Sequence, residues 1–126
     1  MRVTMLLSLI LCLGSVVGLS ETWTGVLVDS KCYDSEQSNV NPFAASPYVA
    51  SDRDLDIRLC HPRAHKTKFF AVVLQDGESF RLDPVGNAKA ADLVTSAGKR
   101  PHYIDVAVTG EMSQGTVKVD SISTVK

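Results

Sequence analysis

The order of predicted strands and helices restricts the fold of this chain more than any other feature. The chain contains five short segments with the residue pattern of β-strands and one segment with the pattern of a helix. The strand-like segments are 22–29, 67–75, 78–83, 102–111 and 116–122. In most of them, apolar and polar residues alternate, whereas the second is apolar on both faces. The helical segment lies between the third and fourth strands. Its apolar residues recur at i, i+3, i+4 and i+7, and they are Ala90, Leu93, Val94 and Ala97.

Turn and capping residues separate these elements. An Asp-Gly pair at 76–77 predicts a two-residue hairpin, and Ser-Gln-Gly at 113–115 predicts a turn between the last two strands. Asn87 is the candidate N-cap of the helix, and Gly98 is its candidate C-terminal stop. Gly25 lies inside the first strand, where a glycine often marks a bulge or a sharp coil.

The order of three strands, a helix and two strands is that of an OB-fold, a five-stranded, partly open Greek-key barrel. Gly25 suits the strongly coiled first strand that such a barrel pairs with both of its sheets. Another small α+β domain with the same order of elements is the alternative. We expect residues 21–126 to form a single mainly β domain, an OB-fold-like Greek-key barrel with one short helix between strands 3 and 4.

Residues 1–20 have the pattern of a secretory signal peptide. Arg2 supplies a positive charge, residues 5–17 are an almost unbroken apolar run, and small residues precede the expected cleavage site after Ser20. Cleavage of the 126-residue chain leaves about 106 residues, enough for one domain. No other stretch approaches the ~20 apolar residues of a membrane span. We therefore expect an exported protein, periplasmic or extracellular, without a transmembrane segment in the mature chain.

The sequence contains three cysteines, of which Cys12 lies in the predicted signal peptide. Leu11 precedes it where a lipoprotein signal needs a small residue, which argues against a lipid anchor. An exported pair of cysteines in a small domain, here Cys32 and Cys60, is most simply a disulfide. The pair lies near the ends of residues 30–66, where no periodicity persists. We expect this 30–66 segment to be a long irregular excursion that the disulfide restrains.

Short motifs in the strands resemble those of small secreted bacterial OB-fold proteins of unknown function. These motifs are Trp-Thr-Gly at 23–25, Asp-Ser-Lys-Cys at 29–32, Val-Thr-Gly at 108–110 and Val-Asp-Ser-Ile at 119–122. The resemblance covers residues 22–31 and 67–124, and it implies the fold but no catalytic or ligand-binding residue. Residues 33–59 form a longer segment than such proteins are expected to have.

Basic residues gather around Cys60 and at the start of the second strand. This basic cluster consists of Arg58, His61, Arg63, His65, Lys66 and Lys68. Arginine and lysine present donors and fixed charge to phosphate and carboxylate groups. OB barrels bind ligands across strands two and three, and the cluster runs into strand two. The candidate ligand-binding residues are therefore Arg58, His61, Arg63, His65 and Lys68. The simpler interpretation is that these charges pair with the acidic run Asp52, Asp54 and Asp56.

Phe69 and Phe70 place one aromatic ring on each face of the second strand. Only one ring can point into a barrel, so the other is either an exposed stacking platform or is covered by the 30–66 segment. Covering is the favoured interpretation, and the candidate covering residues are Phe43, Tyr48, Leu55 and Ile57. Phe70 is also a candidate apolar contact of the ligand site.

Other functional classes have weaker support. His61 and His65, with or without Cys32 and Cys60, are an alternative metal site, although their spacing matches no common zinc motif. The acidic run lacks the glycine and glutamate of an EF-hand, and no nucleophile, phosphate-loop or dinucleotide motif is present. The chain carries 13 Lys+Arg and 14 Asp+Glu, which argues against a nucleic-acid ligand.

These patterns predict an exported, non-enzymatic OB-fold module without a cofactor. Its expected partner is a small or oligomeric envelope ligand or another protein. The alternative function is that of a metal-binding or metal-responsive exported domain.

Overall fold

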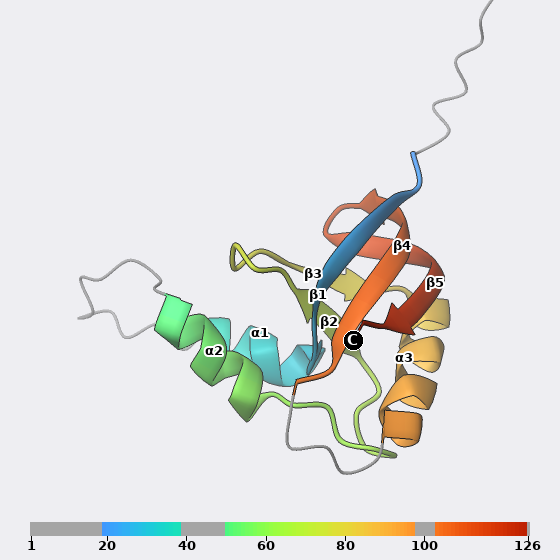
Figure 1. Cartoon of the computed structure of the whole chain (residues 1–126). Coiled ribbons are helices and arrows are strands. Elements are labelled where there is room, and N and C mark those ends of the chain that lie inside the picture. Colours follow the sequence, from blue (N-terminus) through green and yellow to red (C-terminus); the bar gives the residue numbers. More distant parts are fainter. Residues whose placement is uncertain (1–18, 39–49, 98–102, 126) are drawn as a thin grey trace, which may run out of the picture.

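The structure is a computed structural model that describes residues 19–38, 50–97 and 103–125 (Figure 1). The described chain is mainly β, with five strands and three helices. The elements are β1 (Glu21–Asp29), α1 (Ser30–Ser38), α2 (Ala50–Leu59), β2 (Phe70–Val73), β3 (Ser79–Leu82), α3 (Pro84–Ala97), β4 (Asp105–Ser113) and β5 (Thr116–Thr124). The predicted signal peptide lies outside the described residues, apart from residues 19 and 20.

The five strands form one sheet that closes on itself in the order β1-β2-β3-β5-β4. All neighbouring strands are antiparallel except β3 and β5. β1 contacts both of its neighbours in succession, because Val26 pairs with Asp105 of β4 and with Val73 of β2. A Cβ atom on Gly25 would lie 2.6 Å from the carbonyl oxygen of Val73. The glycine therefore allows β1 to coil between the two partners, as predicted.

The interior of the closed sheet contains the main hydrophobic core. Its buried residues come from all five strands, from α3 and from Ile104, which precedes β4. The faces predicted from alternation are confirmed, since Phe80 and Leu82 of β3 are buried while Ser79 and Arg81 are exposed. In the same way, the buried residues of β4 and β5 are Val106, Val108, Val117 and Val119.

The helix between the third and fourth strands is confirmed, but it begins earlier than predicted. Asp83 is its N-cap, because the Asp83 Oδ1 accepts a hydrogen bond from the Gly86 amide at 2.9 Å. Pro84 follows at the first helical position, which proline favours. The prediction that Asn87 caps the helix is therefore wrong. The predicted stop at Gly98 lies outside the described residues.

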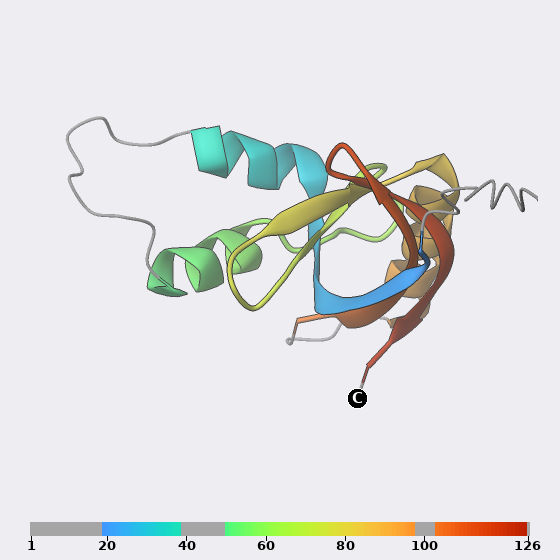
Figure 2. The same cartoon turned by 90° about the horizontal axis from the view of Figure 1, so that it is seen from above.

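Two helices, α1 and α2, occupy residues 30–38 and 50–59 of the 30–66 segment, where an irregular excursion was predicted, so the prediction of a single helix is wrong. α1 and α2 lie on one side of the closed sheet and α3 on the other (Figure 2). The Cys32–Cys60 disulfide is confirmed and joins α1 to the end of α2, with the two Cα atoms 5.4 Å apart. Tyr33 and Ile57 bury their side chains against the outer faces of β1 and β2. Each helix buries few apolar residues, so neither produces a periodic pattern in the sequence.

Both predicted chain reversals are present. Leu74 and Glu78 pair across a three-residue loop at 75–77, one residue longer than predicted, and Gly77 has a φ of 90°. Gln114 and Gly115 form the turn between β4 and β5, with φ values of 51° and 78°. These left-handed conformations favour the Asp-Gly and Gln-Gly sequences found there.

Candidate functional site

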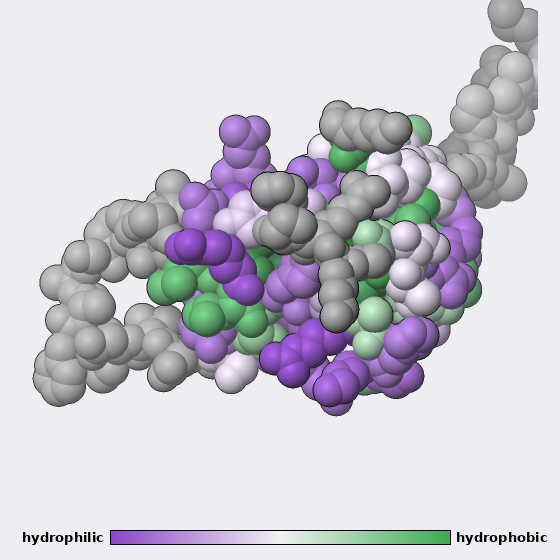
Figure 3. Space-filling model, turned by 60° about the horizontal axis from the view of Figure 1, so that its bottom comes forward, coloured by the Kyte–Doolittle hydropathy of each residue, from purple (hydrophilic) through white to green (hydrophobic). Residues whose placement is uncertain are grey.

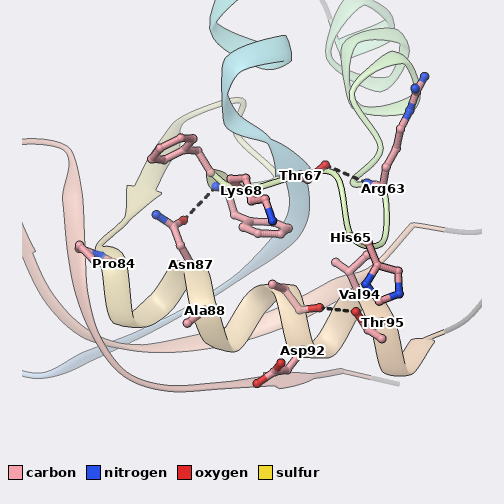
Figure 4. Close-up of a pocket in the computed structure, with 13 residues that line it drawn as sticks. Arg63, His65, Thr67, Lys68, Pro84, Asn87, Ala88, Asp92, Val94 and Thr95 are labelled. Atoms are coloured by element: carbon pink, nitrogen blue, oxygen red, sulfur yellow. Dashed lines mark hydrogen bonds between the residues drawn. The ribbon is translucent and has the colours of Figure 1, made fainter.

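A groove lies between residues 63–70 and one side of α3, and we call it the α3 groove (Figure 4). Its volume is about 560 Å³, within the range of small-molecule sites. Four of the six candidate ligand-binding residues line it, namely Arg63, His65, Lys68 and Phe70. The sequence prediction therefore locates one wall of the groove.

A network around Asp29 holds this wall in place. The Asp29 Oδ1 accepts a hydrogen bond from the Cys32 amide at 3.1 Å and so caps α1. Its Oδ2 accepts a hydrogen bond from the Thr67 hydroxyl at 3.0 Å. The Thr67 hydroxyl in turn accepts one from the Arg63 amide at 2.9 Å. Thr67 is buried, so one carboxylate positions both α1 and the chain that leads to Lys68.

The same network shapes the turn that carries His65. The Arg63 carbonyl accepts hydrogen bonds from the amides of Lys66 and Thr67 at 3.2 and 3.0 Å. His65 lies within this turn and has a φ of 65°, a left-handed conformation that is uncommon outside glycine. The turn places the exposed His65 at the end of the groove near Val94 and Thr95 (Figure 4).

The opposite wall is α3, which contributes mostly small and apolar side chains. Those that line the groove include Ala88, Ala91 and Val94. Asn87 joins the two walls, because its Oδ1 accepts a hydrogen bond from the Phe70 amide at 2.9 Å. A backbone N–H can only donate, so this bond directs the amide nitrogen of Asn87 away from β2. α3 thus provides a wall with three small apolar side chains, one amide donor near its start and one exposed carboxylate, that of Asp92.

The cations of the groove do not pair with the acidic run. Asp54 forms an ion pair with Arg53 at 3.3 Å, and the Gln37 side chain donates to Asp56 at 3.1 Å. The side chain of Asp52 lies outside the described part. Among the described residues, Arg63 and Lys68 form no ion pair. The pairing interpretation is therefore wrong for Asp54 and Asp56, and the positive charge of the groove stays available to a ligand.

Two predicted ligand-binding residues do not reach the groove. Arg58 is exposed in the last turn of α2, and His61 is partly buried after it. Neither residue lines the α3 groove. Exposed leucines 55 and 59 of α2 also lie apart from it. In Figure 3 an apolar area is visible on the side of α1 and α2, while much of the remaining described surface is hydrophilic.

The two phenylalanines have different roles. Phe70 points into the main core and is only 1% exposed, so it forms the base of the groove rather than an accessible contact. Phe69 is 50% exposed, and the Lys31 Nζ lies 4.8 Å from its ring centroid. Ile57 covers Ala71 and Val73 instead. The other named covering residues include Phe43 and Tyr48, which lie outside the described residues.

Sequence reasoning missed the residues that α3 contributes. Asn87, Ala88 and Ala91 are separated from the basic cluster by the β2–β3 hairpin, and alanine carries no functional signal. The polar Asn87 was assigned to the helix cap. Core packing of Ala90 and Val94 and the hydrogen bond from the Phe70 amide to Asn87 bring this wall beside the cluster.

The disulfide leaves neither cysteine sulfur as a thiolate ligand for a metal. Within the described ranges, no three or more His, Cys, Asp or Glu side chains are grouped to hold a metal ion. The helices described here include none long and apolar enough to cross a membrane.

No protein-family model, curated protein or solved structure matches this chain. The functional argument therefore depends on the geometry of the α3 groove.

Proposed function

We propose that this protein is an exported, non-enzymatic OB-fold-like module that binds an anionic envelope ligand in the α3 groove. The observation that supports this most is Lys68, a cation without an ion pair among the described residues, on one wall of a groove of ligand size. A charge-assisted hydrogen bond to a carboxylate or phosphate is stronger than a neutral one. An anion is therefore the ligand group that such a wall favours.

The strand order supports the OB-fold part of the proposal. The closed sequence of pairings and the helix between β3 and β4 suit a five-stranded Greek-key barrel. The competing possibility remains a different small α+β domain with the same elements. The groove and its charges are the same in either case.

The 30–66 segment favours the α3 groove over the surface that OB barrels commonly use. Such barrels bind ligands on the outer face of strands two and three. Here Ala71 and Val73 of β2 are buried beneath Tyr33 and Ile57. α1 and α2 therefore cover most of the outer face of β2.

Export is supported by the disulfide, since such bonds persist mainly in oxidising compartments. The apolar pattern of residues 5–17 points the same way. We propose a periplasmic or extracellular location, where the ligand is part of the envelope or its surroundings.

Titration of the isotope-labelled purified protein with inorganic phosphate and with acetate tests the anion site. We expect saturable NMR shifts in the amides of residues 63–69 and 87–95. The Lys68→Ala variant should weaken phosphate binding about tenfold, because it removes the cation at the Asn87 end of the groove. Lys118→Ala is the matched control, since it removes an exposed lysine of β5 that does not line the groove.

Arg58→Ala and Arg63→Ala complete the series. Loss of binding in Lys68→Ala but not in Arg58→Ala would support the α3 groove over the wider basic cluster. Equal phosphate affinity in the original protein and in the Lys68→Ala and Arg63→Ala variants would overturn the proposal.

A further inference from the structure

We infer that the ligand of the α3 groove is an amphiphile with one anionic headgroup and an apolar chain. This inference rests on the proposed function and names the class of ligand. It follows from the difference between the two walls, because residues 63–69 supply cations whereas the α3 residues that line the groove include no cation and include the apolar Ala88, Ala91 and Val94. A purely polar anion would leave the second wall unused.

The headgroup belongs at the end of the groove where α3 begins. Asn87 lies there and the Lys68 side chain extends over the groove beyond it, whereas the Arg63 side chain points away from α3 (Figure 4). The Asn87 amide nitrogen has no hydrogen-bond partner among the described residues, and its orientation is set by the Phe70 amide. Lys68 and Asn87 together offer a charged and a neutral donor to one carboxylate or phosphate group. The positive end of the α3 dipole adds to this preference.

The apolar chain would lie along α3 from this end towards His65. Asn87 and Thr95 are eight residues apart, so the wall is about 12 Å long at 1.5 Å per residue. Ala88 and Ala91 leave room along it, and Val94 and Phe70 are buried beneath. The Thr95 hydroxyl donates to the Ala91 carbonyl at 3.0 Å, which reduces the polarity of the far end.

The groove is less suited to ligands with several negative charges. Asp92 lines it on the α3 side and is exposed. Its carboxylate repels a second anionic group placed along the wall. This disfavours polyanions such as nucleic acids or acidic glycans, whose charges repeat along the chain.

Isothermal titration with hexanoate, octanoate and decanoate tests the inference, with each acid kept below its micelle concentration. A fully buried methylene strengthens binding about fourfold. In an open groove we expect about two- to threefold for each methylene. Decanol, which has the same chain without the charge, should bind at least tenfold more weakly than decanoate. Decyl phosphate is the second anionic probe. If it binds more tightly than decanoate, the preferred headgroup is a phosphate; if decanoate binds more tightly, it is a carboxylate.

Two matched pairs of variants locate the binding. Ala88→Leu fills the groove from the exposed side of α3 and should weaken decanoate binding about tenfold while acetate binding stays unchanged. Ser96→Leu adds the same side chain to an exposed position of α3 that does not line the groove, and it should have no effect. Lys68→Gln should weaken decanoate binding about tenfold without changing decanol binding, whereas Lys118→Gln should change neither.

The outcomes separate this inference from the proposed function. Phosphate could shift the groove amides while the affinity for the acids does not increase from hexanoate to decanoate. In that case the inference of an amphiphilic ligand is wrong and the proposed anion site is supported. Equal binding of decanol and decanoate would overturn the headgroup assignment. If no probe shifts the groove amides, both the inference and the proposed function are wrong.

Discussion

The described residues form two hydrophobic clusters, and the clusters depend on different parts of the sequence. The inner cluster fills the closed sheet with residues from every strand and from α3. The outer cluster lies between the sheet and the helices α1 and α2, and its members include Cys60 of the disulfide. The comparison indicates that alternation along strands specifies the inner cluster, whereas a covalent bond supports the outer one.

The largest expected effect is the loss of a ring from the inner cluster. Phe80 is 3% exposed, and its ring centroid lies 5.5 Å from that of Trp23. Phe80→Ala should lower the free energy of unfolding by about 3–5 kcal/mol, because it leaves a cavity that the closed sheet cannot fill. Urea denaturation followed by tryptophan fluorescence measures this change. Phe69→Ala, at a half-exposed position, is the control and should cost under about 1.5 kcal/mol. Similar losses in the two variants would mean that the inner cluster is not the main source of stability.

Removal of the disulfide tests the outer cluster. The Cys32→Ser/Cys60→Ser variant should lose roughly 3.6 kcal/mol if loop entropy governs the effect. Hydrogen exchange should become faster in α1, α2 and residues 61–69, while the amides of β4 and β5 remain protected. The original protein treated with a reductant should show the same pattern. Equally faster exchange in every element would show that the two clusters unfold as one unit.

Thr67→Ala tests the connection between the outer helices and the groove. It removes the hydroxyl between Asp29 and the Arg63 amide, at a cost of about 1–3 kcal/mol for the buried groups left without a partner. Phosphate affinity should also fall, since Lys68 follows this residue directly. Thr67→Ser keeps the hydroxyl and should retain most of both properties. Unchanged phosphate affinity in Thr67→Ala would show that the hydrogen-bond network around Asp29 does not position the phosphate-binding residues of the groove.

The smallest effect is expected at the ion pair between α1 and β3. Arg81 and Asp34 are 2.8 Å apart, but their side chains are 63% and 48% exposed. Asp34→Asn should change the free energy of unfolding by at most about 1 kcal/mol, because water and salt screen exposed charges. Thermal denaturation at low and high salt checks this. A loss as large as that of Thr67→Ala would show that charge contributes strongly to the outer region.

The sequence predicted the inner part of the fold well and the outer part poorly. Alternation in β3, β4 and β5 follows directly from the two faces of a strand, and the disulfide was predicted from two cysteines outside the expected signal peptide. α1 and α2 could not be read in the same way, because their turns are polar and bury few residues such as Tyr33 and Ile57. Asp83 was assigned to the third strand and Asn87 to the helix cap, although aspartate followed by proline is also a pattern of helix starts.

For the candidate site, the charged residues of the sequence predicted only the wall of the α3 groove that residues 63–70 form. Arg63, His65 and Lys68 are close in the sequence and carry obvious chemistry. The α3 wall depends on a long-range hydrogen bond between Phe70 and Asn87, and small residues such as Ala88 and Ala91 announce no function. The predicted ion pairs between these cations and the acidic run are absent among the described residues. Asp54 pairs with Arg53 instead, and Asp56 accepts a hydrogen bond from Gln37.

The pairing of β1 with β4 has a consequence for the order of folding. Glu21 pairs with Gly110, so the sheet cannot close before most of the chain has been synthesised. Contacts between such distant residues form slowly and leave strand edges open in the meantime. Cys32 and Cys60 emerge much earlier, and their bond joins the segment after β1 to the segment before β2. Early oxidation would therefore keep β1 beside β2 during the interval in which β4 is still missing.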